Sequence, residues 1–150
     1  MLTPATERDA LASAFATVAE QSFFAYAEAE DPTPGDVAAC PDWMQASVRF
    51  TGLFAGHLRV TVPTSLGFEL CGAFLGTAPD EVLADTAVSD LLGELANMAC
   101  GTWLTDAHSA QSFALTHPEV SHVAGPPPSP LLWMSCNGQP VSVALEESAS

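Results

Sequence analysis

The 150-residue sequence predicts a two-layer α+β domain in which a largely antiparallel sheet of five or six strands is covered by about three helices. Two observations predict this fold class. Segments with the alternating apolar and polar residues of strands come in neighbouring pairs joined by short turns, as in hairpins. Longer segments between them repeat apolar residues with the helical period of about 3.6. Strands that come in hairpins, rather than one by one between helices, favour an antiparallel sheet.

A helix followed by a hairpin is predicted for the first part of the chain. Thr6 or Asp9 can cap a helix that extends towards Glu30, where two prolines stop it because proline has no backbone N–H to donate. Residues 43–54 and 57–62 then alternate apolar and polar side chains on either side of a turn. This pattern predicts two antiparallel strands with one buried face.

Two more helices, a short helical turn and a second hairpin are predicted for the rest of the chain. Residues 64–75 form a helix that ends near Gly76, and residues 78–81 start a short acidic turn. The strongest helical pattern covers residues 89–108. Two apolar runs near the C-terminus are joined by Asn137-Gly138, a dipeptide that favours the tight turn of a hairpin.

The length and the hydrophobic fraction of 48% indicate one globular domain. We expect this domain to occupy residues 1–145, with residues 146–150 as a polar tail that frays. No segment reaches the roughly 18 apolar residues of a membrane span, and the first residues lack the basic and apolar regions of a leader. A cytoplasmic location is therefore expected.

The charge balance argues against several classes of partner. The chain has 18 acidic residues against three arginines and no lysine, which gives a formal net charge of -15. Binding to a nucleic acid backbone or to an anionic lipid surface needs clustered cations, so we expect neither nucleic acid nor a membrane as a partner. The acidity is consistent either with a basic protein surface as partner or with solubility alone.

The spacing of cysteines and histidines predicts no metal site. The cysteines lie about thirty residues apart without a C-x-x-C pair, and no two histidines are spaced like ligands on one helix or hairpin. We expect reduced thiols, with Cys71 and Cys100 buried as small apolar side chains. The residues concerned are Cys40, Cys71, Cys100, Cys136, His57, His108, His117 and His122.

Polar residues form a narrow stripe on the helix predicted over residues 89–108. The stripe consists of Asp90, Glu94, Asn97 and Gly101. Intervals of four, three and four residues place these positions opposite the leucines, so they face outwards. Glu94 and Asn97 are three residues apart, which puts their Cβ atoms about 5 to 6 Å from each other. Both side chains can therefore reach one external target.

Two glycines, Gly93 and Gly101, flank this pair within the helix. Glycine in a helix costs about 1 kcal/mol relative to alanine, so another effect must favour small residues there. Close approach of a second surface is one such effect, and tight packing inside the fold is another.

The segment from Asp90 to Gly101 resembles the signature helix of the CheC/CheX/FliY phosphatases. That signature has an acidic residue or serine, three spacers, Glu, two spacers and Asn, followed by a small glycine. A proline further along the family's sequences resembles Pro118, although its distance from the Asn is slightly short here. Only one copy of the motif is visible, so the resemblance is to the single-site CheX-like branch, and the order of elements extends it over most of the chain.

The resemblance implies a protein phosphatase that hydrolyses phosphoaspartate on a CheY-like response-regulator receiver in chemotaxis or another two-component pathway. Asn97 would position the attacking water, and Glu94 would contact a lysine of the receiver. Asp90, Gly93 and Gly101 would line the contact with this partner. The chain would need no cofactor of its own, because the phosphorylated receiver supplies Mg²⁺. Members of the family often pair through their sheets, so a homodimer formed through the sheet is a further expectation.

Two other functions stay open on the sequence. A non-catalytic module for receiver binding or switch scaffolding, built on the same fold, would bind the receiver without turnover. An unrelated acidic α+β domain would use its sheet edge to dimerise or to recruit a partner.

Overall fold

The computed structural model describes residues 3–78, 81–109 and 111–148, which form four helices and seven strands. The helices are α1 (Pro4–Phe23), α2 (Pro34–Ala38), α3 (Thr64–Leu75) and α4 (Asp85–Ala107). The strands are β1 (Ala27–Ala29), β2 (Trp43–Thr51), β3 (Ala55–Pro63), β4 (Ala114–Leu115), β5 (Glu119–Val123), β6 (Leu132–Cys136) and β7 (Gln139–Ser148). The predicted α+β class is confirmed, with more strands than the five or six expected.

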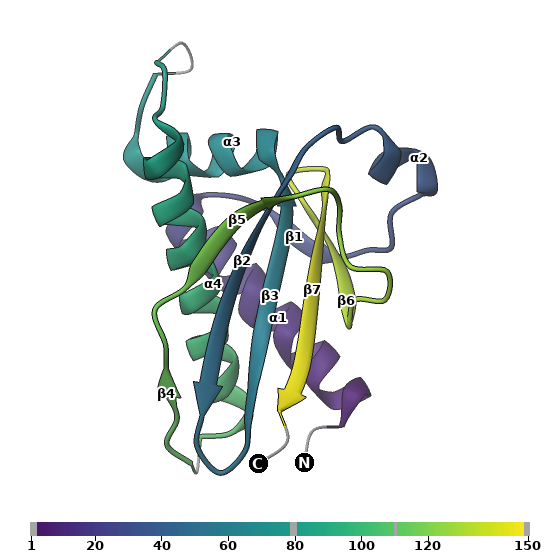
Figure 1. Cartoon of the computed structure of the whole chain (residues 1–150), viewed down its shortest axis with the longest axis vertical. Coiled ribbons are helices and arrows are strands. Elements are labelled where there is room, and N and C mark those ends of the chain that lie inside the picture. Colours follow the sequence, from purple (N-terminus) through teal and green to yellow (C-terminus); the bar gives the residue numbers. More distant parts are fainter. Residues whose placement is uncertain (1–2, 79–80, 110, 149–150) are drawn as a thin grey trace.

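The seven strands form one antiparallel sheet that is backed by helices on one side (Figure 1). Its order is β1-β6-β7-β3-β2, and both β4 and β5 pair with the outer edge of β2. The predicted hairpins are β2–β3 and β6–β7. The two long helices α1 and α4 lie behind the sheet, which gives the predicted two layers.

The core lies between the sheet and these helices. Along β2, alternate residues from Met44 to Phe50 are buried on the helix side, and the register places them opposite Val62, Val60 and Leu58 of β3. The helices contribute further buried residues: Leu11, Ala14, Phe15 and Val18 from α1, and Leu92, Leu95, Ala96, Ala99 and Cys100 from α4. Removal of this apolar surface from water is the main source of stability.

The turn between β6 and β7 needs left-handed backbone at both of its residues. Asn137 has φ 49° and Gly138 has φ 81°, values that asparagine and glycine adopt most readily. Asn137 Oδ1 accepts a hydrogen bond from the Tyr26 amide at 3.0 Å, and its Nδ2 donates to Glu69 at 2.7 Å. The turn is thus hydrogen-bonded both to the residue before β1 and to helix α3.

The ends of α1 differ from the prediction. Thr3 occupies the N-cap position and Pro4 opens the helix, where the missing N–H has no intrahelical partner to lose. At the other end Phe24 adopts a left-handed conformation with φ 55°. The helix therefore stops well before Glu30, and the next residues pair with β6 as strand β1.

Strand β7 continues to Ser148, beyond the boundary expected at residue 145. Glu146 lies opposite His57 in the ladder, and its carboxylate accepts a hydrogen bond from Arg59 Nη1 at 3.3 Å. These contacts order residues 146–148, so the expectation of a frayed tail from residue 146 is corrected there. Residues 149 and 150 lie outside the described part of the chain, as do residues 79 and 80 of the expected acidic turn.

A buried carboxylate connects the two long helices. Glu7 of α1 is 3% exposed and accepts a hydrogen bond from the indole Nε1 of Trp103 at 2.9 Å. His108 Nε2 lies 2.9 Å from the same carboxylate oxygen. Because a buried carboxylate without partners is costly, these bonds fix the position and rotation of α4 against α1. The direction in which α4 presents its polar stripe is thereby set.

Candidate functional site

Helix α4 presents the predicted polar stripe to solvent. Asp90 and Glu94 are exposed and Asn97 is half-buried, whereas the opposite side of the helix faces the core. The buried side includes Val88, Leu92, Leu95, Ala99 and Trp103. The prediction that the polar stripe points outwards is confirmed.

The segment from β4 to β5 forms a second wall beside this stripe. Between the two strands, the Thr116 amide donates to the Arg49 carbonyl oxygen at 2.9 Å, and the Arg49 amide donates to Thr116 Oγ1 at 3.2 Å. The ladder with β2 resumes at Glu119. The wall is thus attached to the sheet on both sides of His117.

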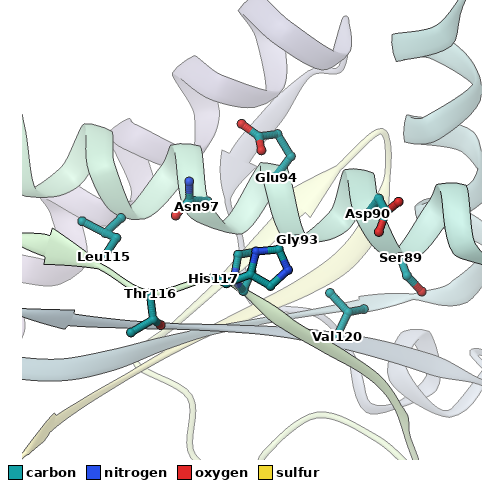
Figure 2. Close-up of a pocket in the computed structure, with 10 residues that line it drawn as sticks. Ser89, Asp90, Gly93, Glu94, Asn97, Leu115, Thr116, His117 and Val120 are labelled. Carbon is teal, nitrogen blue, oxygen red and sulfur yellow. The ribbon is translucent and has the colours of Figure 1, made fainter.

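A groove of about 820 Å³ separates helix α4 from this wall. Figure 2 shows Asp90, Glu94 and Asn97 on the helix, with Thr116 and His117 across the groove from them. The remaining lining residues are Ser89, Gly93, Leu115, Pro118 and Val120. Four of the five expected site residues therefore line one groove, and Gly101 lies further along α4 beside a smaller one.

The two glycines of α4 have different surroundings. Gly93 is buried, and a Cβ atom there would lie 3.1 Å from Pro118 Cγ and 3.4 Å from Val120 Cγ2. Gly93 thus lets the β4–β5 wall pack closely against the helix. A Cβ atom at Gly101 would meet nothing within 4 Å. Packing inside the fold therefore explains the glycine at position 93 but not the one at position 101.

The polar groups of the stripe have no partners inside the described part of the protein. No hydrogen bond or ion pair connects Asp90, Glu94 or Asn97 to another described side chain. Arginine is absent from the lining, and His117 is its one side chain that can carry positive charge. The groove consequently combines free carboxylates and a free amide at an acidic rim.

This arrangement can bind an external group in a defined way. A carboxylate accepts hydrogen bonds and attracts a cation, while a carboxamide both donates and accepts and carries no net charge. Because Glu94 and Asn97 project from one rigid helix, their separation does not depend on a flexible loop. They can therefore hold a water and a cationic side chain of a bound protein at set positions.

The wall opposite α4 was not identified from the sequence. Thr116 and His117 enter the groove only because β4 and β5 pair with β2 beside the helix. Pro118 was identified through the family resemblance, but the sequence did not predict which residue it contacts. Its contact with Gly93 depends on segments 25 residues apart in the chain and is therefore invisible to a local pattern.

No cysteine is among the residues that line this groove. Cys71, Cys100 and Cys136 are buried as free thiols, which confirms the predicted burial of the first two. Burial raises the pKa of the Cys100 thiol to about 12, so this residue of α4 stays protonated. In the described ranges no group of three or more His, Cys, Asp or Glu is placed to hold a metal ion, and no helix is long and apolar enough for a membrane span.

A sequence model of a protein family covers both walls of the groove. It matches residues 44–126, more than half of the chain, and describes the chemotaxis phosphatase CheX. The chain belongs to the CheX family. The resemblance noted for the α4 motif is therefore confirmed at the level of the family, and the matched region contains the whole groove of this CheX-family protein.

Solved structures of CheX proteins have the fold of this family member. CheX from Vibrio vulnificus has 18% sequence identity and a TM-score of 0.76, and the match covers 99% of this chain and 100% of the other. CheX from Desulfovibrio desulfuricans has 17% identity and a TM-score of 0.70, with coverages of 95% and 99%. At these identities the similarity shows the fold, and a search of curated proteins found no match.

A third similar structure is a complex. It contains CheX, CheY, BeF3 and Mg²⁺ from Borrelia burgdorferi, and its matching chain has 12% identity and a TM-score of 0.63, with coverages of 94% and 97%. A protein with the same fold as this CheX-family chain has therefore been observed together with CheY.

Proposed function

We propose that this CheX-family protein accelerates the hydrolysis of phosphoaspartate on a CheY-type receiver in the cytoplasm. The observation that carries the proposal is the pairing of Glu94 and Asn97, three residues apart on α4, which both line a groove and are free of partners within the described structure. Side chains that are already bonded inside the fold would have to break those bonds before acting on another protein. These two are available without such a cost.

Asn97 is proposed to hold the attacking water in line with phosphorus. Its carboxamide oxygen accepts a hydrogen bond from the water, while the neutral group avoids the repulsion that a carboxylate would exert on phosphoryl oxygens. The water oxygen forms a bond to phosphorus, the bond to the aspartyl oxygen breaks, and the phosphate product takes up the proton of the water. Phosphoryl transfer passes through a loose transition state, so positioning of this kind is a sufficient contribution.

Glu94 is proposed to contact a lysine of the receiver. An ion pair with a hydrogen bond would fix the orientation of the two proteins, so that the phosphoryl group meets Asn97. Asp90 lies on the same rim and would extend the acidic contact, while Gly93 and Gly101 would leave room for the partner. The acidic rim suits a cationic contact of this kind.

Mg²⁺ is proposed to come from the receiver and not from this chain. The groove lining offers Asp90 and Glu94 without a third acidic or histidine ligand grouped with them in the described structure. The Borrelia burgdorferi complex includes Mg²⁺ together with CheY. The chain's own residues would therefore supply the water position and the docking contact, and the receiver would supply the metal.

The proposal is tested by following the decay of phosphorylated receivers. CheY-type receivers encoded in the same genome, together with CheY of Borrelia burgdorferi, are charged with acetyl phosphate and mixed with the chain. We expect faster phosphate release from at least one receiver. Binding without faster release would favour the non-catalytic module, and the absence of both would contradict the proposal.

A homodimer formed through the sheet is a separate part of the proposal. The side of the sheet remote from the helices carries Arg49 and Glu119 beside the Arg59–Glu146 pair, so two copies can place opposite charges next to each other. Sedimentation at micromolar concentration should give twice the mass of the chain. A monomer under these conditions would contradict this part without affecting the proposed reaction.

A further inference from the structure

His117 occupies a defined position in the groove. It is exposed and lies across the groove from α4 (Figure 2). The preceding residue, Thr116, is hydrogen-bonded to Arg49, and the following residue, Pro118, packs on Gly93. A residue before proline is also restricted to extended backbone. The base of the His117 side chain is consequently held in place.

The imidazole of His117 has no partner among the described residues. The other three histidines each lie near a carboxylate, of Glu7, Asp42 or Glu146. His117 has no such contact in the described part of the chain. A histidine held between two anchored neighbours and left without a partner is available to a bound molecule.

The groove is surrounded by acidic side chains, and His117 can counter their charge. Asp90 and Glu94 line the same groove from α4, Glu119 follows on β5, and the backbone of Arg49 in β2 is hydrogen-bonded to the neighbouring Thr116. A phosphoryl group that enters between these carboxylates is repelled by them. His117 is the one lining side chain that can carry a positive charge, and its ring N–H can donate a hydrogen bond to the phosphoryl group.

We propose that His117 is a third functional side chain of the site, which contacts the phosphoryl oxygens of the docked receiver opposite Asn97. This inference rests on the proposed phosphatase function. His117 makes and breaks no covalent bond and donates one hydrogen bond to the phosphoryl group. A positive charge at this position strengthens the contact, because the phosphoryl oxygens are negative.

The test compares three His117 variants with a histidine outside the groove. His117→Gln keeps a hydrogen-bond donor without the charge, His117→Arg keeps a charge at every pH, and His117→Ala removes both. His122→Gln is the matched control, because His122 is an exposed residue of β5 that pairs with Asp42 at 3.2 Å and does not line the groove. Thermal unfolding checks that all four variants fold.

The readout is the ratio of receiver dephosphorylation rates with and without the chain, at one fixed pH. For His117→Ala we expect a ratio about tenfold below that of the unmodified chain, and for His117→Gln, which keeps a hydrogen-bond donor, a smaller loss. His117→Arg should keep a high ratio, and His122→Gln should behave like the unmodified chain.

Two outcomes separate this inference from the proposed function. If the unmodified chain accelerates a receiver and Asn97→Ala abolishes the effect, but His117→Gln and His117→Ala match the unmodified chain, this inference is overturned and the phosphatase function stands. If the unmodified chain accelerates no receiver, the phosphatase function itself fails, and the role of His117 fails with it.

Discussion

The Cγ atom of Pro118 lies 3.1 Å from the position that a Cβ atom on Gly93 would occupy, so the two residues meet in direct contact between α4 and the β4–β5 wall. This contact joins the two walls of the groove. A larger residue at position 93 would push apart the two walls that carry Asn97 and His117. The geometry of the site therefore depends on a residue without a side chain.

Substitution of the two α4 glycines by alanine should have opposite effects on stability. Gly101→Ala gains up to about 1 kcal/mol of helix propensity, because its Cβ atom meets nothing within 4 Å. Gly93→Ala gains the same amount but forces a contact of 3.1 Å with the rigid ring of Pro118, and we expect a net loss of about 1 kcal/mol. Urea unfolding of the two variants measures both values. Equal stabilisation would show that the wall can move away from the helix.

The Gly101→Ala variant also tests why a small residue occupies position 101. If a docked partner approaches α4 there, Gly101→Ala should weaken receiver binding while it stabilises the free protein. Unchanged binding would leave the glycine at position 101 without a role in docking. Titration of a beryllofluoride-loaded receiver with the unmodified chain and the variant measures the difference.

Asn97→Ala should reduce receiver dephosphorylation by about 100-fold or more, with little effect on folding. The side chain is half-buried at the groove and makes no described bond inside the protein, so its removal leaves the core intact. Asn97→Asp should be as inactive, because a carboxylate repels the phosphoryl oxygens. Asp106→Asn, an exposed change on the same helix outside the groove, serves as control. Undiminished acceleration by both Asn97 variants would rule out the proposed water contact.

Glu94→Ala should act mainly on binding of the receiver. Loss of a charge-assisted contact at an exposed rim is expected to weaken the affinity about tenfold at low salt, and less as salt rises. The affinity of Glu94→Gln should lie between those of the unmodified chain and Glu94→Ala, because glutamine keeps the hydrogen bond and loses the charge. Affinity for the beryllofluoride-loaded receiver, measured at two salt concentrations, separates docking from catalysis. A salt-independent loss would argue against an ion pair with the receiver.

The stability of the protein should fall as the pH decreases below about 6.5, in part because of His57. This histidine is 6% exposed, and neither ring nitrogen has a hydrogen-bond partner among the described residues. Burial, followed by the nearby Arg59, lowers the pKa of His57 in the folded state, although Glu146 at 3.5 Å opposes the shift. The unfolded chain therefore binds a proton at higher pH than the folded one, and protonation favours unfolding.

His57→Gln should remove part of this pH dependence. Above pH 7 the free energies of unfolding of the two proteins should differ by a constant amount. Between pH 6.5 and pH 5 the free energy of unfolding should fall less steeply for the variant. The difference in slope cannot exceed about 1.4 kcal/mol per pH unit, the value for one proton. Urea unfolding over this pH range measures it, with the exposed His122→Gln variant as control. Parallel curves would exclude His57 as the titrating group.

Several elements could be predicted from the sequence because local patterns specify them. The β2–β3 hairpin leaves an alternating pattern, since apolar residues of both strands face the helices and more polar residues face the other side. On β3 the second face is also partly covered, because His57 and Thr61 are buried. The β6–β7 turn requires two left-handed residues, which Asn137-Gly138 supply. The end of α3 at Gly76, with φ 68°, follows from the same freedom of glycine.

Other elements left no such pattern. Strand β5 has no fully buried residue, because it lies at the edge of the sheet, so its sequence does not alternate between core and solvent. Strand β1 is three residues long and exists through its pairing with β6. The frayed tail expected from residue 146 was wrong for residues 146–148 because their partners on β3 lie about ninety residues away in the chain.

The sequence by itself determined the helix that carries the site and the outward direction of Glu94 and Asn97, because the periodicity of an amphipathic helix depends only on residues within a few turns. The tertiary structure alone decided what faces that helix. Thr116, His117 and Pro118 are brought to α4 by strand pairing with β2, and Glu7 fixes the rotation of α4 through Trp103 and His108. Such long-range contacts have no period in the sequence, since they depend on the packing of whole elements.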